Sequence, residues 1–218
     1  MHFDPTVLLT FPVFLLSIIV HECAHALAAF WLGDPTARER GRLTLNPLPH
    51  IDWLGSVIVP ATLLAFRVPF LFGWAKPVPV DWARLRRPHD DQVKVALAGP
   101  ASNFLLAMCF AAVVRLAPQT GFWAPLELMG VAGVYWNCAL GLFNLIPIPP
   151  LDGSWVLMRF LPLRHIIALQ QFRILGIALV AILLSSPPIS HFLVEGPLRM
   201  AVRGCLALVG APYEGVFR

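Results

Sequence analysis

Charged side chains are scarce in this chain. Asp, Glu, Lys and Arg make up 13% of its 218 residues, whereas soluble domains contain about 25%. So few charges cannot cover a globule with polar surface, and 58% of the residues are hydrophobic. The composition therefore argues against a soluble domain and predicts an integral membrane protein in contact with a lipid bilayer.

Other signals are missing as well. The four cysteines have no CxxC spacing, so nothing indicates a disulfide framework, and we interpret them as small apolar residues. The apolar N-terminal segment lacks the basic flank of a signal peptide. The alternation of a transmembrane β-barrel is also missing, so spanning segments should be helical. The net charge is +4, which we interpret as a cytoplasmic face and not as a nucleic-acid-binding surface.

Long uncharged windows are abundant, and several reach the roughly 20 residues that a spanning helix needs. We expect an all-α polytopic membrane protein that forms a single domain over residues 1–218, with about five or six hydrophobic segments. The tail helix could lie in the membrane interface instead of spanning. The segments are expected near residues 6–32, 53–67, 93–116, 128–148, 166–184 and 197–210.

The second segment, which starts near Trp53, lies between two basic loops. The positive-inside rule places both loops in the cytoplasm, which a single crossing cannot satisfy. One solution is a re-entrant segment: a helix to about Arg67 that returns as an extended strand of roughly a dozen residues at about 3.3 Å each. The alternative is an ordinary helix with one imperfect loop.

Ionisable residues interrupt the first segment in the sequence "HECAH". His21 and His25 are four residues apart, so they lie on one face of a helix and can share a zinc ion. Glu22 points along a different radius and can reach a water on the metal. This HExxH pattern is the zinc metalloprotease signature, with the glutamate as general base. The alternative is a structural polar cluster between helices.

Two histidines do not complete a catalytic zinc site, which usually takes three protein ligands. We predict Asp152 as the third ligand, because it follows a proline-rich break in "PIPPLDG" that opens the chain at membrane depth. Asp152 could instead cap a helix that begins near Ser154. Among the other histidines, His50 is the reserve candidate for a ligand.

Three motifs in combination, "HECAH", "AGPASN" and "NLIPIPPLDG", resemble the site-2 protease family of intramembrane zinc metalloproteases. The loops "GDPTARERGRLTLNPLPHID" and "FGWAKPVPV" are similar to its short prokaryotic form, which lacks a PDZ domain. The resemblance implies one Zn²⁺ per chain, held by His21, His25 and Asp152. It also implies Glu22 as the catalytic acid/base and places Asn144 near the substrate.

The stretch "GWAKPVPV" is a candidate surface for holding a substrate. Pro77 and Pro79 remove the hydrogen-bond donors from one edge of a strand, whereas Val78 and Val80 keep theirs on the other edge. That edge could pair with an unwound transmembrane segment; the alternative is a rigid proline-containing loop.

Two asparagines in apolar segments need hydrogen-bond partners. Asn144 could bind the substrate backbone or a developing oxyanion, or make an interhelical hydrogen bond. The interhelical role suits Asn103 better, because Gly99 and Ala101 allow close helix approach.

These observations predict an intramembrane zinc endopeptidase that cleaves membrane-anchored protein or peptide substrates. The alternative is a metal-cation transporter that uses the same His/Asp cluster, although the repeated halves typical of transporters are missing from the sequence. We expect a multi-pass protein of the cell membrane, with its N-terminus outside and its active site toward the cytoplasm. We expect no nucleic-acid partner, and the sequence does not indicate an oligomeric state.

Overall fold

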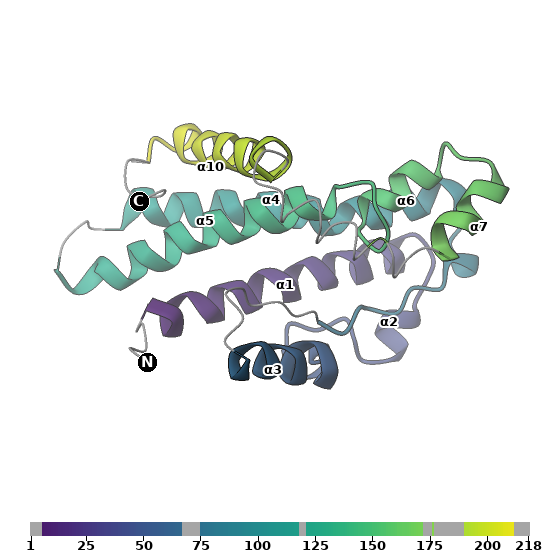
Figure 1. The fold of residues 1–218 in the computed structure, drawn as a ribbon, viewed down its shortest axis with the longest axis horizontal. Coiled ribbons are helices and arrows are strands. Elements are labelled where there is room, and N and C mark those ends of the chain that lie inside the picture. Colours follow the sequence, from purple (N-terminus) through teal and green to yellow (C-terminus); the bar gives the residue numbers. More distant parts are fainter. Residues whose placement is uncertain (1–5, 67–74, 118–120, 172–175, 177–189, 212–218) are drawn as a thin grey trace.

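The computed structural model describes residues 6–66, 75–117, 121–171, 176 and 190–211 (Figure 1). The chain in these ranges is helical and contains no strand. The α-helices are α1 (Thr6–Trp31), α2 (Thr36–Glu39), α3 (Val59–Ala65), α4 (Pro88–Leu116), α5 (Ala124–Asn144), α6 (Gly153–Met158), α7 (Leu163–Gln171) and α10 (Gly196–Leu208). Short turns of other helix types are η1 (Leu48–His50), η2 (Trp53–Ile58), η3 (Trp82–Arg84), η4 (Gly121–Trp123) and η5 (His191–Glu195).

Three helices in the described ranges are long and apolar enough to cross a membrane. They cover Leu8–Trp31, Pro88–Leu116 and Gly121–Asn144, and they correspond to the first, third and fourth predicted segments. Most of the predicted segment 166–184 lies outside the described residues, so the total of five or six stays a prediction. The chain thus has the long apolar helices of a membrane protein.

The boundaries of two helices differ from the sequence-based expectation. α4 begins earlier than residue 93 because Pro88 occupies its first turn, where proline is tolerated, and the Asp91 carboxylate accepts from Arg87 N at 2.9 Å. α5 ends at Asn144 and not near Ile148. The residue before a proline disfavours helical backbone, so Pro147 stops the helix early.

α1, α4 and α5 pack together into the central bundle (Figure 1). α4 and α5 run side by side, and small residues let them come close. A Cβ atom built at Gly133 of α5 would overlap the Phe110 ring of α4, and one at Gly130 would lie 2.8 Å from Val114 Cγ2. The two glycines therefore set the distance between these helices, and α1 fits along the pair.

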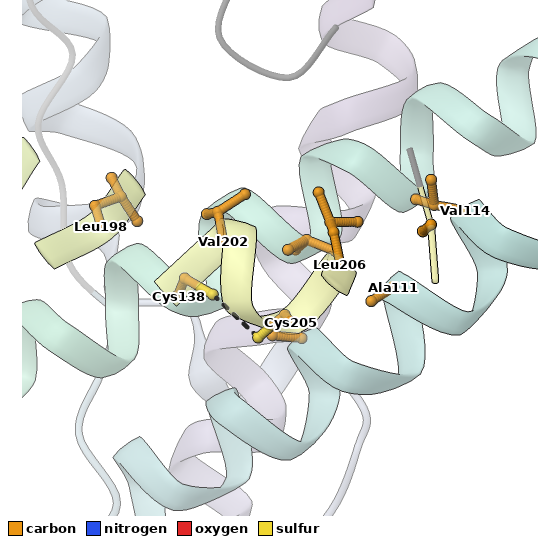
Figure 2. Close-up of a cluster of buried hydrophobic side chains, with 10 residues drawn as sticks. Ala111, Val114, Cys138, Leu198, Val202, Cys205 and Leu206 are labelled. Atoms are coloured by element: carbon orange, nitrogen blue, oxygen red, sulfur yellow. Dashed lines mark hydrogen bonds between the residues drawn. The ribbon is translucent and has the colours of Figure 1, made fainter. Parts of the chain in front are cut away.

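α10 packs on the far side of α4 and α5 (Figure 1). Leu198, Val202 and Leu206 recur at helical spacing along one face of α10, and all three are buried. They contact Ala111, Val114 and Cys138 on the facing helices (Figure 2). The predicted tail helix therefore exists and packs on the bundle; its position relative to a membrane interface stays a prediction.

The region of the predicted re-entrant segment is described only in part. η2 and α3 form a helical unit from Trp53 to Ala65, as expected for its first half. Residues 67–74 lie outside the described ranges. Residues 75–81, called here the 75–81 segment, have no regular secondary structure, so the returning strand is not confirmed.

Three buried polar side chains or backbone groups hold the 75–81 segment in place. Arg42 Nη2 donates to Lys76 O at 2.6 Å and to Pro77 O at 3.3 Å. His50 O accepts from Lys76 N at 2.9 Å. Asp34, which is fully buried, accepts from Asp81 N at 2.7 Å. These bonds tie the segment to the part of the chain that follows α1.

Candidate metal centre

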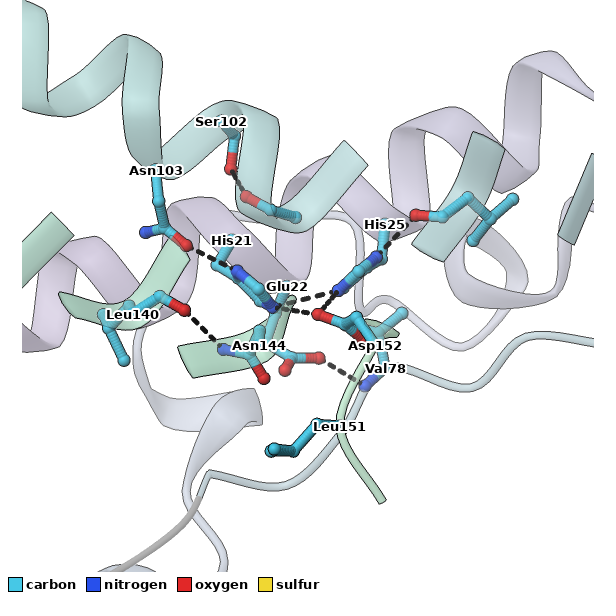
Figure 3. Close-up of polar contacts among 12 residues, drawn as sticks. His21, Glu22, His25, Val78, Ser102, Asn103, Leu140, Asn144, Leu151 and Asp152 are labelled. Atoms are coloured by element: carbon cyan, nitrogen blue, oxygen red, sulfur yellow. Dashed lines mark hydrogen bonds and ion pairs between the residues drawn. The ribbon is translucent and has the colours of Figure 1, made fainter. Parts of the chain in front are cut away.

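Three predicted site residues from distant parts of the sequence meet between α1 and the start of α6 (Figure 3). His21 Nε2 lies 3.1 Å from Asp152 Oδ2, and His25 Nε2 lies 3.3 Å from the same oxygen. The two Nε2 atoms are 3.0 Å apart. Only 7% of His21 and 9% of His25 is exposed. No other such group of three His, Cys, Asp or Glu side chains occurs in the described ranges.

Local structure explains how the three side chains converge. His21 and His25 lie one turn apart on α1, so both rings face α4 and α6. Asp152 occupies the N-cap position of α6, yet its side chain makes no capping hydrogen bond, and the carboxylate points to the histidines instead. Gly153 permits this turn, because a Cβ atom there would lie 2.5 Å from Leu145 C.

The outer nitrogens of both histidine rings are held by acceptors on α4. His25 Nδ1 donates to Val95 O at 2.7 Å, and His21 Nδ1 lies 2.6 Å from Asn103 Oδ1. A neutral imidazole carries one proton, so a ring that donates from Nδ1 has a lone pair on Nε2. Metal-binding histidines usually donate their second nitrogen in this way.

The arrangement fits a divalent cation. The two Nε2 lone pairs and Asp152 Oδ2 are all electron donors, and they face one another at about 3 Å. Asp152 Oδ2 is buried and has no hydrogen-bond partner, which is costly for an ionised oxygen. A cation at the point of convergence would relieve the repulsion among the three lone pairs and would give Asp152 Oδ2 a partner. A set of two imidazoles and a carboxylate suits zinc.

Gly99 gives the histidines room on the α4 side. A Cβ atom at this position would lie 2.6 Å from His21 Cε1 and would overlap His25 Nε2. Real Cβ contacts are not so short, so a larger residue would displace one ring or separate the helices. The close approach of α4 to α1 therefore depends on this glycine.

Glu22 is hydrogen bonded to the 75–81 segment. Its Oε2 accepts from Val78 N at 2.8 Å (Figure 3). The Val78 donor that we expected on a free edge is therefore engaged by Glu22. Val80 packs near Ala29, Leu85 and Val95. Pairing of this edge with a substrate stays a prediction.

Asn144 lies at the end of α5, and its amide nitrogen donates to Leu140 O at 3.0 Å, one turn back in the same helix. His50, the reserve candidate for a ligand, does not lie with His21, His25 and Asp152. It is 2% exposed, its Nε2 donates to Thr44 O at 2.9 Å, and its carbonyl holds Lys76.

Sequence reasoning missed the contact between Asn103 and His21. We predicted an interhelical hydrogen bond for Asn103, and this prediction is correct, but the motif gave no partner. A signal was present, because Asn103 follows Gly99 by one helical turn and therefore lies on the face of α4 that approaches the histidines. The missing information was the register between the two helices.

Comparison with known proteins agrees with this site. A family model described as Peptidase family M50 matches residues 116–186. "Putative zinc metalloprotease YwhC" of Bacillus subtilis (strain 168) is 37% identical over 154 residues, which cover 68% of this chain and 67% of YwhC. "Putative zinc metalloprotease Rip2" of Mycolicibacterium smegmatis is 30% identical over 185 residues, which cover 83% of this chain and 68% of Rip2. No solved structure matches the chain.

The chain therefore belongs to the metallopeptidases of family M50. The resemblance of its motifs to the site-2 protease family is thereby confirmed. Family membership and the three long apolar helices both fit a membrane protein.

Proposed function

We propose that this protein is an intramembrane zinc endopeptidase that cleaves membrane-anchored proteins within or near the bilayer. One observation carries the proposal: the lone pairs of His21, His25 and Asp152 converge beside long apolar helices, and Glu22 follows the first of these residues directly. The names of the relatives support zinc as the ion. Family membership favours peptide hydrolysis over metal transport. Within the part of the chain that the structure describes, one such centre occurs, which suggests one Zn²⁺ per chain.

Zinc bound by His21, His25 and Asp152 would polarise the scissile carbonyl and lower the pKa of a bound water. Glu22 would take a proton from the attacking water and pass it to the leaving amine, so it acts first as base and then as acid. Val78 N engages one oxygen of this carboxylate, Oε2, and we assign the proton transfer to the other oxygen.

A peptide bond in a helix is a poor substrate, because its amide and carbonyl groups are already paired. The substrate must be unwound and held extended. We assign this task to the 75–81 segment, with Val78 and Val80 on the pairing edge and Asn144 as a further polar contact.

We further propose a multi-pass protein of the cell membrane, folded as a single domain, with its centre toward the cytoplasm. Arg38, Arg40 and Arg42 follow the end of α1 that carries the histidines, and basic loops favour the cytoplasmic side. The N-terminus would then lie outside.

The proposed function predicts that Asp152→Ala loses zinc. The purified wild type should contain about one zinc ion per chain and cleave a transmembrane substrate. Removing one of three protein ligands should bring zinc content near zero and abolish cleavage. The measurement is metal analysis of the detergent-solubilised full chain, together with a gel assay of the substrate.

Asp90→Ala is the matched control. The Asp90 carboxylate is half-exposed and pairs with Arg159 at 2.8 Å, so its loss should change neither zinc content nor cleavage. A wild type without zinc, or an Asp152→Ala protein that keeps both zinc and cleavage, would contradict the proposed centre.

If the 75–81 segment holds the substrate, altering it should lower the cleavage rate without changing the zinc content. Replacing residues 76–80 with a Gly/Ser sequence keeps the backbone donors but removes the stiffness that Pro77 and Pro79 provide. Cleavage should fall by about 10-fold or more, since ordering a flexible strand costs roughly 1 kcal/mol per residue. Zinc content should stay at the wild-type value. Unchanged cleavage would exclude this segment as the substrate platform.

A further inference from the structure

A chain of buried hydrogen bonds leaves the metal centre and crosses three helices. It runs from His21 Nδ1 to Asn103 Oδ1 on α4 at 2.6 Å, and from Asn103 Nδ2 to Asn137 Oδ1 on α5 at 2.9 Å. Asn137 Nδ2 then donates to Ser17 Oγ at 2.8 Å, back on α1. Asn103, Asn137 and Ser17 are each 0% exposed. Three fully buried polar side chains in an apolar bundle are costly unless each is fully paired.

Backbone carbonyl groups, which can only accept, fix the direction of this chain. Asn137 lies 2.8 Å from Gly133 O, so the atom facing that carbonyl must be its amide nitrogen. The Ser17 hydroxyl donates to Val13 O at 2.7 Å, so its lone pairs face Asn137. Both contacts turn the oxygen of Asn137 toward Asn103.

The orientation of Asn137 in turn determines the orientation of the Asn103 amide. Its amide nitrogen faces Asn137 Oδ1 and also Ser17 O, at 3.3 Å. Its oxygen therefore faces His21, and the ring must carry its proton on Nδ1. The lone pair of His21 is thereby placed on Nε2, toward His25 and Asp152.

The two histidines differ in how their tautomers are set. His25 donates to Val95 O, a backbone acceptor that cannot be reversed. The partner of His21 is a side-chain amide, which presents either oxygen or nitrogen according to its own neighbours. An Asn103 that turned its nitrogen toward His21 would favour the tautomer in which Nε2 is protonated and cannot bind a metal.

We infer that Asn137 and Ser17, whose side chains make no hydrogen bond to His21, His25 or Asp152, are positioning residues that hold Asn103 and thereby the metal-binding tautomer of His21. This inference rests on the proposed zinc site and extends it to a second layer on α5. Outer partners of ligating histidines typically contribute a factor of 10–100 in metal affinity. Asn137 acts only through Asn103, so the effects of the two residues should not be independent.

A double-mutant cycle in the full-length purified protein tests this dependence. Zinc dissociation constants are measured by chelator competition for the wild type, Asn103→Leu, Asn137→Leu and the double variant. Asn103→Leu should weaken zinc binding by about 10–100-fold and Asn137→Leu by about 10-fold. The double variant should match Asn103→Leu alone, because the outer residue has nothing left to orient. The visible spectrum of bound Co²⁺ should change in both single variants, as the His21 ring loses its fixed orientation.

Cys138→Ala is the packing control. Cys138 is the fully buried neighbour of Asn137 on α5, and its side chain contacts Cys205 and takes no part in the hydrogen bonds that lead to His21. It should keep the wild-type zinc affinity and Co²⁺ spectrum. Asn137→Ala replaces Asn137→Leu if the larger side chain prevents folding. Independent, multiplicative losses in the double variant, or an unchanged affinity in both Asn137 variants, would overturn the inference while leaving the zinc site intact. A wild type that binds no zinc would instead overturn the proposed function and this inference with it.

Discussion

Glu22→Gln is expected to abolish cleavage of a transmembrane substrate while the protein keeps its zinc. A general base contributes about 10²–10⁴-fold to a hydrolytic rate, and glutamine cannot accept the proton. The change is nearly isosteric. The glutamine side-chain oxygen can still accept from Val78 N, which lies 2.8 Å from Glu22 Oε2 in the wild type, so the surrounding backbone should not move. The measurement is the initial cleavage rate together with zinc content per chain.

Glu39→Gln provides the matched control for this prediction. Glu39 is an exposed residue of α2 that pairs with Arg84 at 3.0 Å, and its neutralisation should leave the rate unchanged. The same variants separate a peptidase from a metal transporter. Zinc transport is measured in vesicles that contain the wild type or Glu22→Gln. If both proteins transported zinc equally and neither cleaved the substrate, the assignment as a peptidase would be wrong.

Gly99→Ala is expected to disrupt the metal centre through a single methyl group. The added Cβ would lie 2.6 Å from His21 Cε1 and would overlap His25 Nε2. Both histidines project from α1 toward α4, so the clash must displace a ring or push α4 outward. We expect zinc affinity to fall by about 100-fold, at the upper end for changes beside metal ligands. Overpacking should also destabilise the fold by about 1–3 kcal/mol.

Gly204→Ala is the control for replacing a helical glycine with alanine. Gly204 lies in α10, and a Cβ atom there would have nothing within 4 Å. Alanine should be neutral or slightly stabilising at this helical position, by up to about 1 kcal/mol. Chelator competition and thermal unfolding of both variants distinguish the outcomes. Wild-type zinc affinity in Gly99→Ala would mean that α4 does not approach the histidines as closely as described.

The elements nearest the predicted ligands could be derived from the sequence because local rules determine them. The spacing of His21 and His25 places both on one helix face whatever surrounds them. The proline-rich break before Asp152 predicts opened chain at that point. The structure brings these three residues together; their role as ligands, and that of Glu22 as base, stay predictions.

The features that the sequence did not provide depend on contacts between distant elements. Val78 looked like a free donor on a strand edge, but the position of α1 decides that it meets Glu22. The sequence did not predict a role for Asn137, because a single asparagine in an apolar helix has no spacing pattern that indicates its partners. Its hydrogen bonds depend on the register of α5 against α1 and α4, which helix periodicity alone does not supply.

The proposed ligands are far apart in the order of synthesis. His21 and His25 are made early, on α1, whereas Asp152 follows only after α4 and α5 are complete. A growing chain that has inserted its first helix would thus present two imidazoles but no third ligand. Under the proposed function, hydrolytic competence would arise only once the bundle has assembled, so a nascent or truncated chain would not cleave neighbouring membrane proteins.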